Sequence, residues 1–509
     1  MGRKVVRGAA VLLLAGIVAR VLGFFYRIFL AREIGAQGMG LISMAYPLMG
    51  MALNLAACGL PVALAKVVAE RLALPGRSVA WVLKFALAFV LVTGTVFSAL
   101  LILTAPWLSH HILTDPRSLF PLLALVPQLI IIPVAMVLRG YFQGRQNMPP
   151  LAVATILEQV TRIFGVMFLV PYFLPYGLAW AAVGAAVAMT LGEVVGLAIL
   201  VVAYRFPGWF DRARLPPVPP EHPADRLLAT ARELLGLGLP VTGTRLVGSF
   251  TDIGDAVVVP RRLEVSGMTR DQATSFYGNL SAMAMPLLFF PTVITGALST
   301  ALMPAISEAE AVMGVGGVRR RTEQAVHATF LLAFPAAAVF AALGHPLGAV
   351  IYGQRTAGDL LVPLAFTAPC LYLDTTFQAV LRGLGHPAIP MMNGLVGSVG
   401  RLLLIYLLTA WRLGGVEAVV IGISTDMVVS TGLDAIVIWR MVGPRLETAR
   451  SIIWPLAWTA VMVLVNRMLL GLAGPLHNQA IGLTLAIVVG AAVYVTGVWR
   501  SGCLRGLAG

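Results

Sequence analysis

Residues 17–27 of the chain read IVARVLGFFYR, and residues 242–252 read TGTRLVGSFTD. Both stretches lie in hydrophobic surroundings, and arginine, glycine and phenylalanine keep their places in the two copies. The seventh residue after the arginine differs, because the first copy has Arg27 where the second has Asp252. This pair of stretches predicts a duplicated helical membrane protein, in which one position of the repeated stretch carries opposite charges in the two copies.

The composition supports a membrane protein. Of 509 residues, 59% are hydrophobic and 11% are charged, whereas roughly 25% are charged in an average soluble domain. Windows of about 20 apolar residues, long enough to cross a bilayer as a helix, recur along the chain and are too continuous for barrel strands. We therefore predict an all-α polytopic fold with fourteen membrane helices, at 9–30, 42–65, 79–105, 119–142, 151–172, 177–203, 234–257, 274–303, 325–345, 358–381, 389–411, 415–439, 452–472 and 479–499.

The chain is predicted to consist of two repeats of six helices. A proline-rich polar stretch at 204–232 reads as a cytoplasmic linker, and short motifs recur on both sides of it, such as VLRG at 137–140 and 380–383. An even number of helices makes the repeats parallel, an arrangement typical of transporters. The expected parts are an N-lobe at 1–203, the linker at 204–232, a C-lobe at 233–441 and two additional helices at 450–500.

The net charge is +14, and membrane topology explains where the basic residues lie. Basic residues concentrate in alternate loops, which does not indicate a nucleic-acid-binding face. The side opposite the amino terminus holds only Arg32, Arg117, Arg261, Arg262, Arg270, Arg355, Arg412 and Arg467. The positive-inside rule then places both termini in the cytoplasm, and the first segment, which contains Arg20, reads as a helix and not a cleaved signal peptide.

Arginines inside the first predicted helix are the best candidates for substrate binding. Arg20, Gly23 and Arg27 follow an i, i+3, i+7 pattern on one helix face. Charged groups within membrane helices usually face a partner or a functional site, and guanidinium groups suit phosphate oxygens. A diphosphate head group would fit this stripe. The alternative for Arg27, and less so for Arg20, is a structural role in which the side chain extends to the membrane interface.

The matching stripe in the second half carries Arg245, Gly248 and Asp252, followed by Asp255. Arg245 is a candidate substrate ligand. The two carboxylates lie on neighbouring faces of one turn, as a bound cation or a transferable proton would require. A buried ion pair between Asp252 and Arg245, or with a neighbouring helix, remains an equal alternative.

Other polar residues in the predicted helices carry weaker signals. Asn54 is a candidate substrate ligand and Asn393 a candidate for ion coupling, although either amide could equally bridge two helices. Glu158 and Arg162 have the spacing of a structural i, i+4 pair. Five further charged residues have no spacing that selects a role: Lys84, Glu193, Asp374, Asp426 and Asp434.

Motifs of enzymes and metal sites are missing from the sequence. No lysine follows a glycine, so there is no Walker A loop, and there is no H-E-x-x-H. Cys58, Cys370 and Cys503 lack metal-like spacing. We therefore expect neither an enzyme nor a bound cofactor.

Four stretches resemble one family. Residues 20–27 (RVLGFFYR), 33–40 (EIGAQGMG), 44–47 (MAYP) and 59–70 (GLPVALAKVVAE) are similar to the stage V sporulation protein B group. This group belongs to the multidrug/oligosaccharidyl-lipid/polysaccharide exporter superfamily, together with MurJ-like flippases and MATE exporters. The resemblance spans essentially the whole chain.

The resemblance implies positions for two sites. The first-helix arginines of MurJ-like flippases correspond to Arg20 and, with a shift of one residue, to Arg27, and their seventh-helix aspartate at a sodium site corresponds to Asp255. The sequence departs from these flippases at Leu41, where they have an acidic residue, and at 280–281, where they have an arginine. Arg401 also disfavours a sodium site in its helix, because a guanidinium repels a cation.

The resemblance further implies a flippase for an undecaprenyl-diphosphate-linked saccharide, such as a peptidoglycan precursor for the spore cortex, in the cytoplasmic membrane. Fourteen helices favour a flippase over the twelve usual in MATE exporters, and the last pair would hold the lipid tail. We expect a monomer that contacts membrane lipids and cell-wall synthesis proteins and is coupled to Na⁺ or H⁺. The alternatives are a MATE-like multidrug exporter and a non-transporting scaffold for cell-wall assembly.

Overall fold

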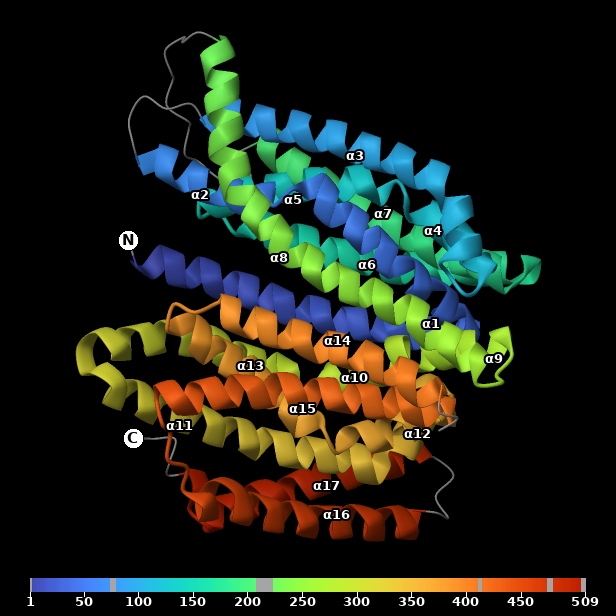
Figure 1. The fold of residues 1–509 in the computed structure, drawn as a ribbon, viewed down its shortest axis with the longest axis vertical. Helices are drawn as coiled ribbons and strands as arrows, with labels where there is room; N and C mark the ends of the chain where they lie inside the picture. The colour runs from blue at the N-terminus through green and yellow to red at the C-terminus, as the bar shows by residue number, and fades with distance from the viewer. Residues whose placement is uncertain (1, 74–78, 207–222, 411–413, 474–478, 505–509) are drawn as a thin grey trace. The chain divides into compact units, whose positions relative to one another are not determined.

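The computed structural model describes residues 2–73, 79–206, 223–410, 414–473 and 479–504. Most of the predicted linker at 204–232 lies outside these residues. Throughout the described residues the regular structure is helical, with no strand, which confirms the predicted all-α class. The chain divides into two compact units, residues 1–260 with 270–278 and residues 261–269 with 279–509 (Figure 1).

The first unit contains the following helices: α1 (Gly2–Ala57), α2 (Leu60–Ala73), α3 (Val79–His111), η1 (Pro116–Ser118), α4 (Leu119–Leu125), α5 (Gln128–Gly144), α6 (Pro149–Phe173), η2 (Leu174–Tyr176), α7 (Leu178–Arg205), α8 (Pro223–Val265) as far as Pro260, and α9 (Arg270–Gly278). The second unit contains the end of α8 and the following helices: η4 (Asn279–Ala284), α10 (Met285–Phe289), α11 (Thr292–Tyr352), α12 (Arg355–Ala365), α13 (Ala368–Gly383), α14 (Ala388–Ala410), α15 (Gly415–Met441), η5 (Ala449–Ile453), α16 (Trp454–Ala473) and α17 (Gln479–Arg500).

Two predicted connections are much shorter than expected. The sequence suggests a loop between the spans 9–30 and 42–65, but α1 continues through it and departs from helical geometry only at Gly35 (φ 63°). In the same way, α11 bends only at Gly314 (φ 61°) between the spans 274–303 and 325–345. Glycine adopts positive φ without a Cβ clash, so one residue is enough to break each helix.

The described helices support a multi-pass membrane protein. Nine are long and apolar enough to cross a bilayer, or eleven if each of two bent pairs counts as one crossing. The bent pairs are η1 and α4 with α5, at 41°, and α12 with α13, at 63°. They occupy the fourth and tenth predicted spans, which correspond in the proposed repeat. The repeat itself and the total of fourteen crossings stay predictions.

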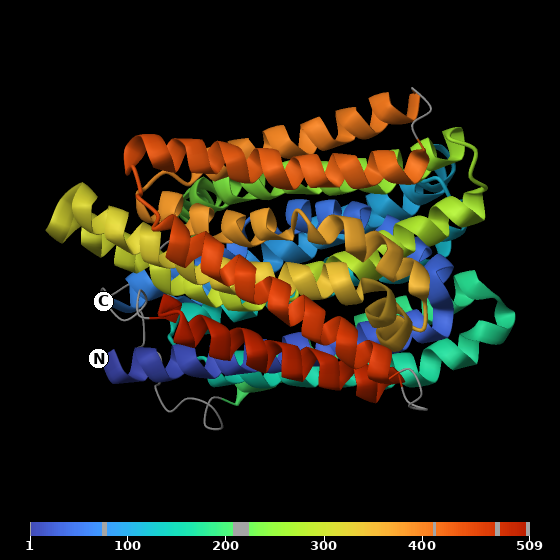
Figure 2. The same ribbon diagram turned by 90° about the horizontal axis from the view of Figure 1, so that it is seen from below.

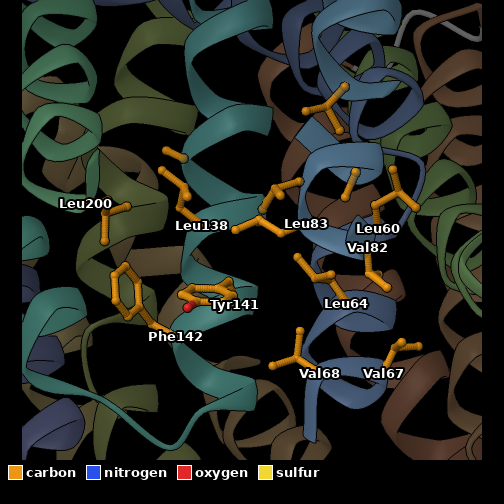
Figure 3. Close-up of a cluster of buried hydrophobic side chains, with 14 of the residues drawn as sticks. Leu60, Leu64, Val67, Val68, Val82, Leu83, Leu138, Tyr141, Phe142 and Leu200 are labelled. Atoms are coloured by element: carbon orange, nitrogen blue, oxygen red, sulfur yellow. The ribbon is translucent and has the colours of Figure 1, made fainter. Parts of the chain in front are cut away.

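Buried aliphatic and aromatic side chains hold one end of the first unit together. Leu64 of α2, Leu83 of α3, Tyr141 of α5 and Leu200 of α7 belong to one continuous cluster in which each is at most 2% exposed. Figure 3 shows these side chains converging between the helices. The cluster also contains Leu151 and Ala154 of α6, so it joins α6 to these helices.

Small residues allow α6 and α7 to approach closely. A Cβ atom at Gly184 would lie 2.8 Å from the carbonyl oxygen of Leu169, and one at Gly192 would lie 2.9 Å from that of Glu158. Membrane helices commonly pack through such small residues. The tight contact brings polar side chains of the two helices within bonding distance.

The last two helices pack on the second unit. α16 and α17 lie side by side (Figures 1 and 2) and also contact α11. His327 of α11 bonds through Nδ1 to the Ser451 hydroxyl (3.0 Å) and through Nε2 to the Cys503 carbonyl (2.9 Å). Because a carbonyl only accepts, Nε2 carries a proton, and His327 links both ends of the helix pair to α11.

The units and the predicted lobes are defined differently. The first unit includes α8 as far as Pro260 together with α9, whereas the repeat assigns both helices to the C-lobe. The lobe boundaries therefore stay predictions. Contacts of α8 and α9 within the first unit join elements that the repeat assigns to different lobes.

Candidate functional site

Gly23, the middle residue of the predicted arginine stripe on α1, faces α6. The two helices pack together, and a Cβ atom at Gly23 would lie 3.6 Å from Oε1 of Gln159 on α6. Arg20 and Arg27 are exposed. Neither guanidinium has a hydrogen bond or ion pair with another described residue. The two groups are therefore available to an anionic ligand.

Polar side chains beside this stripe were not identified from the sequence. Tyr26 is only 6% exposed and its hydroxyl has no partner among the described residues. Tyr46, in the second half of α1, donates a hydrogen bond to the Met189 sulfur (2.7 Å). Both tyrosines lie within electrostatic reach of Arg27 and Arg162, so they connect the stripe to the charges on α6.

Those charges form a network across α5, α6 and α7. The carboxylate of Glu158 accepts from Arg139 (2.7 Å) and Arg162 (2.9 Å), and Arg162 also donates to Glu193 (2.9 Å). The predicted pair of Glu158 and Arg162 is confirmed, but it is part of a larger balanced set of two guanidiniums and two carboxylates. Nothing in the spacing of Arg139 and Glu193 predicted their convergence, because it results from helix packing.

The residues of the second stripe lie on α8 and differ from one another in solvent exposure. Arg245 and Asp252 are exposed and Asp255 is half-buried. Arg245 has no ion pair with a described residue, so the pair with Asp252 that the sequence left open is not among the described contacts. Both aspartates make interactions.

The two candidate asparagines bond to protein groups. Nδ2 of Asn54 donates to the Ser249 hydroxyl (3.0 Å), which links α1 to α8 within the first unit. In the second unit, Nδ2 of Asn393 donates to Asp434 (2.7 Å), whose side chain is almost completely buried. Both amides thus act as bridges between helices. Their predicted roles in substrate binding and ion coupling stay untested.

A second polar cluster joins α9 to η1 and α1 in the first unit. The Asp115 carboxylate caps η1 and accepts from the Arg117 guanidinium (2.6 Å) and from the Thr274 hydroxyl (3.1 Å). Arg117 also pairs with Asp271, which accepts from Gln37 (2.7 Å). We call these five residues the α9 latch.

Burial alone would raise the pKa of the Asp115 carboxyl, but the hydrogen bonds from Arg117 and Thr274 outweigh burial and hold this pKa below its ordinary value. The Asp115 carboxyl is therefore ionised at neutral pH. Tight packing reinforces the α9 latch, because a Cβ atom at Gly40 would collide with the Thr274 carbonyl oxygen.

The start of α8 makes a corresponding contact with α1 and α2. Arg71 of α2 pairs with Glu233 of α8 at 2.5 Å. Gly59 has φ 61°, and a Cβ atom there would collide with the carbonyl oxygen of Gly238. Glycine is required at position 59 both for its backbone conformation and for this close approach.

No group of three or more histidine, cysteine, aspartate or glutamate residues within the described ranges is arranged to hold a metal ion. The three cysteines are unpaired thiols. Coupling to Na⁺ or H⁺ stays a prediction.

Comparison with known proteins identifies relatives along most of the chain. A family model described as "Polysaccharide biosynthesis protein" matches residues 5–310. Stage V sporulation protein B of Bacillus subtilis (strain 168) is 35% identical over 433 residues, covering 84% of this chain and 82% of that protein. The lipid II flippase MurJ of the same organism is 24% identical, with coverage of 100% and 97%.

Solved structures share the fold. The lipid II flippase MurJ in an inward closed conformation matches with a TM-score of 0.70 at 14% identity, covering 97% of this chain and 99% of that one. An inward-facing MATE transporter of the MOP superfamily matches with a TM-score of 0.63 at 16% identity, with coverage of 87% and 94%. These identities are low, so the likeness concerns the fold.

Proposed function

The chain belongs to the polysaccharide biosynthesis protein family, and from this premise we propose that it is a flippase and not an enzyme. Its substrate is an undecaprenyl-diphosphate-linked saccharide, a lipid II-like peptidoglycan precursor used for the spore cortex. The protein moves this lipid across the cytoplasmic membrane by alternating access. Both termini lie in the cytoplasm, and the protein acts as a monomer.

One observation carries the proposal. Arg20 and Arg27 lie in an apolar helix, without a protein anion to neutralise them among the described residues. A membrane-embedded guanidinium is costly unless it has a partner. A diphosphate supplies several oxygens that accept charge-assisted hydrogen bonds from such groups, and it matches the charge of the stripe.

Alternating access requires contacts that can be broken. The α9 latch and the contact of Arg71 with Glu233 both join elements of different predicted lobes. With a cytoplasmic amino terminus, the α9 latch lies at the outer end of the first unit and the Arg71 contact at the inner end. Rocking of the lobes would open one end while the other remained closed.

The driving ion remains part of the proposal. Asp252 and Asp255 on α8 are the groups that we assign to Na⁺ or H⁺ coupling. A MATE-like exporter of amphipathic cations would favour an acidic binding site, and the unpartnered arginines argue against it. A cell-wall assembly scaffold would not require Arg20 or Arg27.

The test is translocation in liposomes that contain purified protein and fluorescent lipid II. Arg20→Gln and Arg27→Gln should each weaken transport about 10- to 100-fold, since a hydrogen bond to a charged group contributes about 1.5–3 kcal/mol. Arg500→Gln, at the exposed end of α17, is the control and should retain wild-type transport. Equal translocation by wild type and both stripe variants would refute the capture role. Dye efflux without lipid flipping would identify an exporter, and neither activity would favour the scaffold.

A further inference from the structure

The side chain of the partly buried Gln159 on α6 carries a carboxamide that makes no hydrogen bond with a described residue. Its Oε1 atom is buried. Burial of an amide without a hydrogen bond is unfavourable. In the apolar part of a membrane protein, such a group indicates a ligand that supplies the missing bond.

The position of Gln159 identifies that ligand as the one held by the arginine stripe. With a rise of about 1.5 Å per residue, Gly23 lies about 4.5 Å along α1 from Arg20 and about 6 Å from Arg27. A ligand that contacts both guanidiniums must therefore pass over Gly23. A Cβ atom at Gly23 would lie 3.6 Å from Oε1 of Gln159, so the carboxamide of Gln159 is adjacent to the path of this ligand.

We propose that Gln159 is a further substrate-binding residue, which reads a neutral polar group of the saccharide next to the diphosphate. A carboxamide both donates and accepts, so it suits a sugar hydroxyl or an N-acetyl amide. It adds no charge, and the arginines alone hold the phosphates. The Tyr26 hydroxyl, also without a partner, lies one helical turn from Gly23 and completes this subsite. The inference rests on the proposed function.

The charge network holds Gln159 in place. Glu158, the preceding residue, is bonded by arginines of two helices, and Arg162 is bonded on both α6 and α7. Rigid support of this kind is what a recognition residue requires. In the second half of the chain, aligning VGR at 399–401 with VTR at 160–162 places Gly397 and Ser398 at the positions of Glu158 and Gln159, so the subsite belongs to the first half alone.

The first test replaces Gln159 with leucine, which is similar in size and needs no hydrogen bond. Binding to purified protein in lipid nanodiscs is measured for lipid II and for undecaprenyl diphosphate, which lacks the sugar. We expect lipid II to bind about tenfold more weakly, the expected effect of losing a neutral hydrogen bond in a desolvated site. Binding of undecaprenyl diphosphate should stay unchanged, and the thermal stability of the protein should not fall, because the amide that is removed has no hydrogen bond to lose.

The second test is Gly23→Ala. The new methyl group would lie 3.6 Å from the Gln159 oxygen, in ordinary contact, so it would narrow the space beside the carboxamide without displacing α1. Alanine is also the better helix former, so the variant should fold normally while it discriminates less between the two lipids. Gly16→Ala, on the same helix but outside the stripe, is the matched control, because a Cβ atom there meets nothing within 4 Å.

The outcomes separate the subsite from the proposed function. The subsite is refuted if Gln159→Leu weakens both lipids equally, leaves both unchanged, or lowers stability in parallel with binding. Wild-type protein that binds neither lipid would refute the proposed function and the subsite with it. Wild-type protein that binds both lipids equally would leave the diphosphate role intact and overturn the sugar-reading role.

Discussion

The charge network of the first unit gives a prediction whose size follows from its geometry. Glu158 accepts from two guanidiniums on α5 and α6, whereas Glu193 accepts from one. The side chains of Glu158, Arg162 and Glu193 are at most 16% exposed, so solvent screens these pairs weakly. Glu158→Gln should therefore destabilise the protein more than Glu193→Gln does.

The expected magnitudes differ because the remaining partners differ. Glu158→Gln leaves Arg139 without its carboxylate and Arg162 with only Glu193, and breaking a buried pair in this way costs about 3–5 kcal/mol. Glu193→Gln leaves Arg162 still bonded to Glu158, so only one charge-assisted bond is lost, about 1.5–3 kcal/mol. The double variant should cost less than the sum, since both carboxylates share Arg162.

Thermal unfolding of the purified protein in detergent measures this order. A change of 1 kcal/mol shifts Tm by about 2–4 °C in domains of 150–250 residues. Unfolding of large proteins is often irreversible, so all variants are compared at one heating rate. Glu310→Gln, an exposed position on α11, should leave Tm almost unchanged. Equal shifts for Glu158→Gln and Glu193→Gln, or additive effects in the double variant, would refute the network as described.

Three further predictions concern other contacts. Cross-linking cysteines placed at Gln37 and Asp271, in a variant without native cysteines, should block lipid transport, and reduction should restore it. The same cross-link between positions 120 and 180, whose rings lie 5.6 Å apart in α4 and α7, should have no effect. The pKa of the Asp115 carboxyl is lowered on folding, so its contribution to stability is present at neutral pH and disappears as the pH falls through the pKa of the folded state. Asp115→Asn should therefore reduce the loss of stability at acidic pH. An unchanged loss would exclude Asp115 as its source. His327→Ala should increase hydrogen exchange at the ends of α16 and α17, whereas unaltered protection would show that helix packing alone holds the pair.

The sequence predicted the fold well because membrane helices have a strong local signal. Apolar windows located α6, α7 and α14–α17 to within about two residues, and α3 at its start but six residues short at its end. The connections at Gly35 and Gly314 were predicted too long. A single positive φ ends a helix as sharply as a loop does, and hydropathy does not report backbone angles.

The site was less predictable, since its parts meet only through packing. Gln159 is a neutral residue next to an obvious ion pair, and only the helix that covers it shows that its carboxamide has no partner. Nothing in the spacing of Arg139 pointed to Glu158, yet the two side chains bond between α5 and α6. Asn54 was predicted to bind substrate because it is a polar residue in an apolar helix, but α8 packs nearby and its Ser249 hydroxyl accepts the hydrogen bond from Asn54. In each case the deciding contact comes from another helix.

The two halves of the chain place their buried carboxylates in opposite ways. In the first unit Glu158 on α6 faces a glycine of α7, since a Cβ atom at Gly196 would lie 3.4 Å from its Oε2. In the second unit the position aligned with Glu158 is Gly397 on α14, and the carboxylate that faces it is Asp426 of α15. Each helix pair thus has one glycine and one acid in contact. The first helix, α6, supplies the acid in the first unit, and the second helix, α15, supplies it in the second unit.

The aligned arginines keep their function through this exchange. Arg162 on α6 bonds Glu193 of α7 at 2.9 Å, and Arg401 on α14 bonds Asp426 of α15 at 3.0 Å. An arginine on the first helix of each pair therefore neutralises an acid on the second, which limits the cost of both charges inside the membrane. Only the first unit adds Glu158 and the adjacent Gln159. The Glu158 carboxylate bonds both Arg139 and Arg162 and thereby holds the adjacent Gln159 beside the stripe. We therefore expect substrate recognition to depend on the first half of the chain.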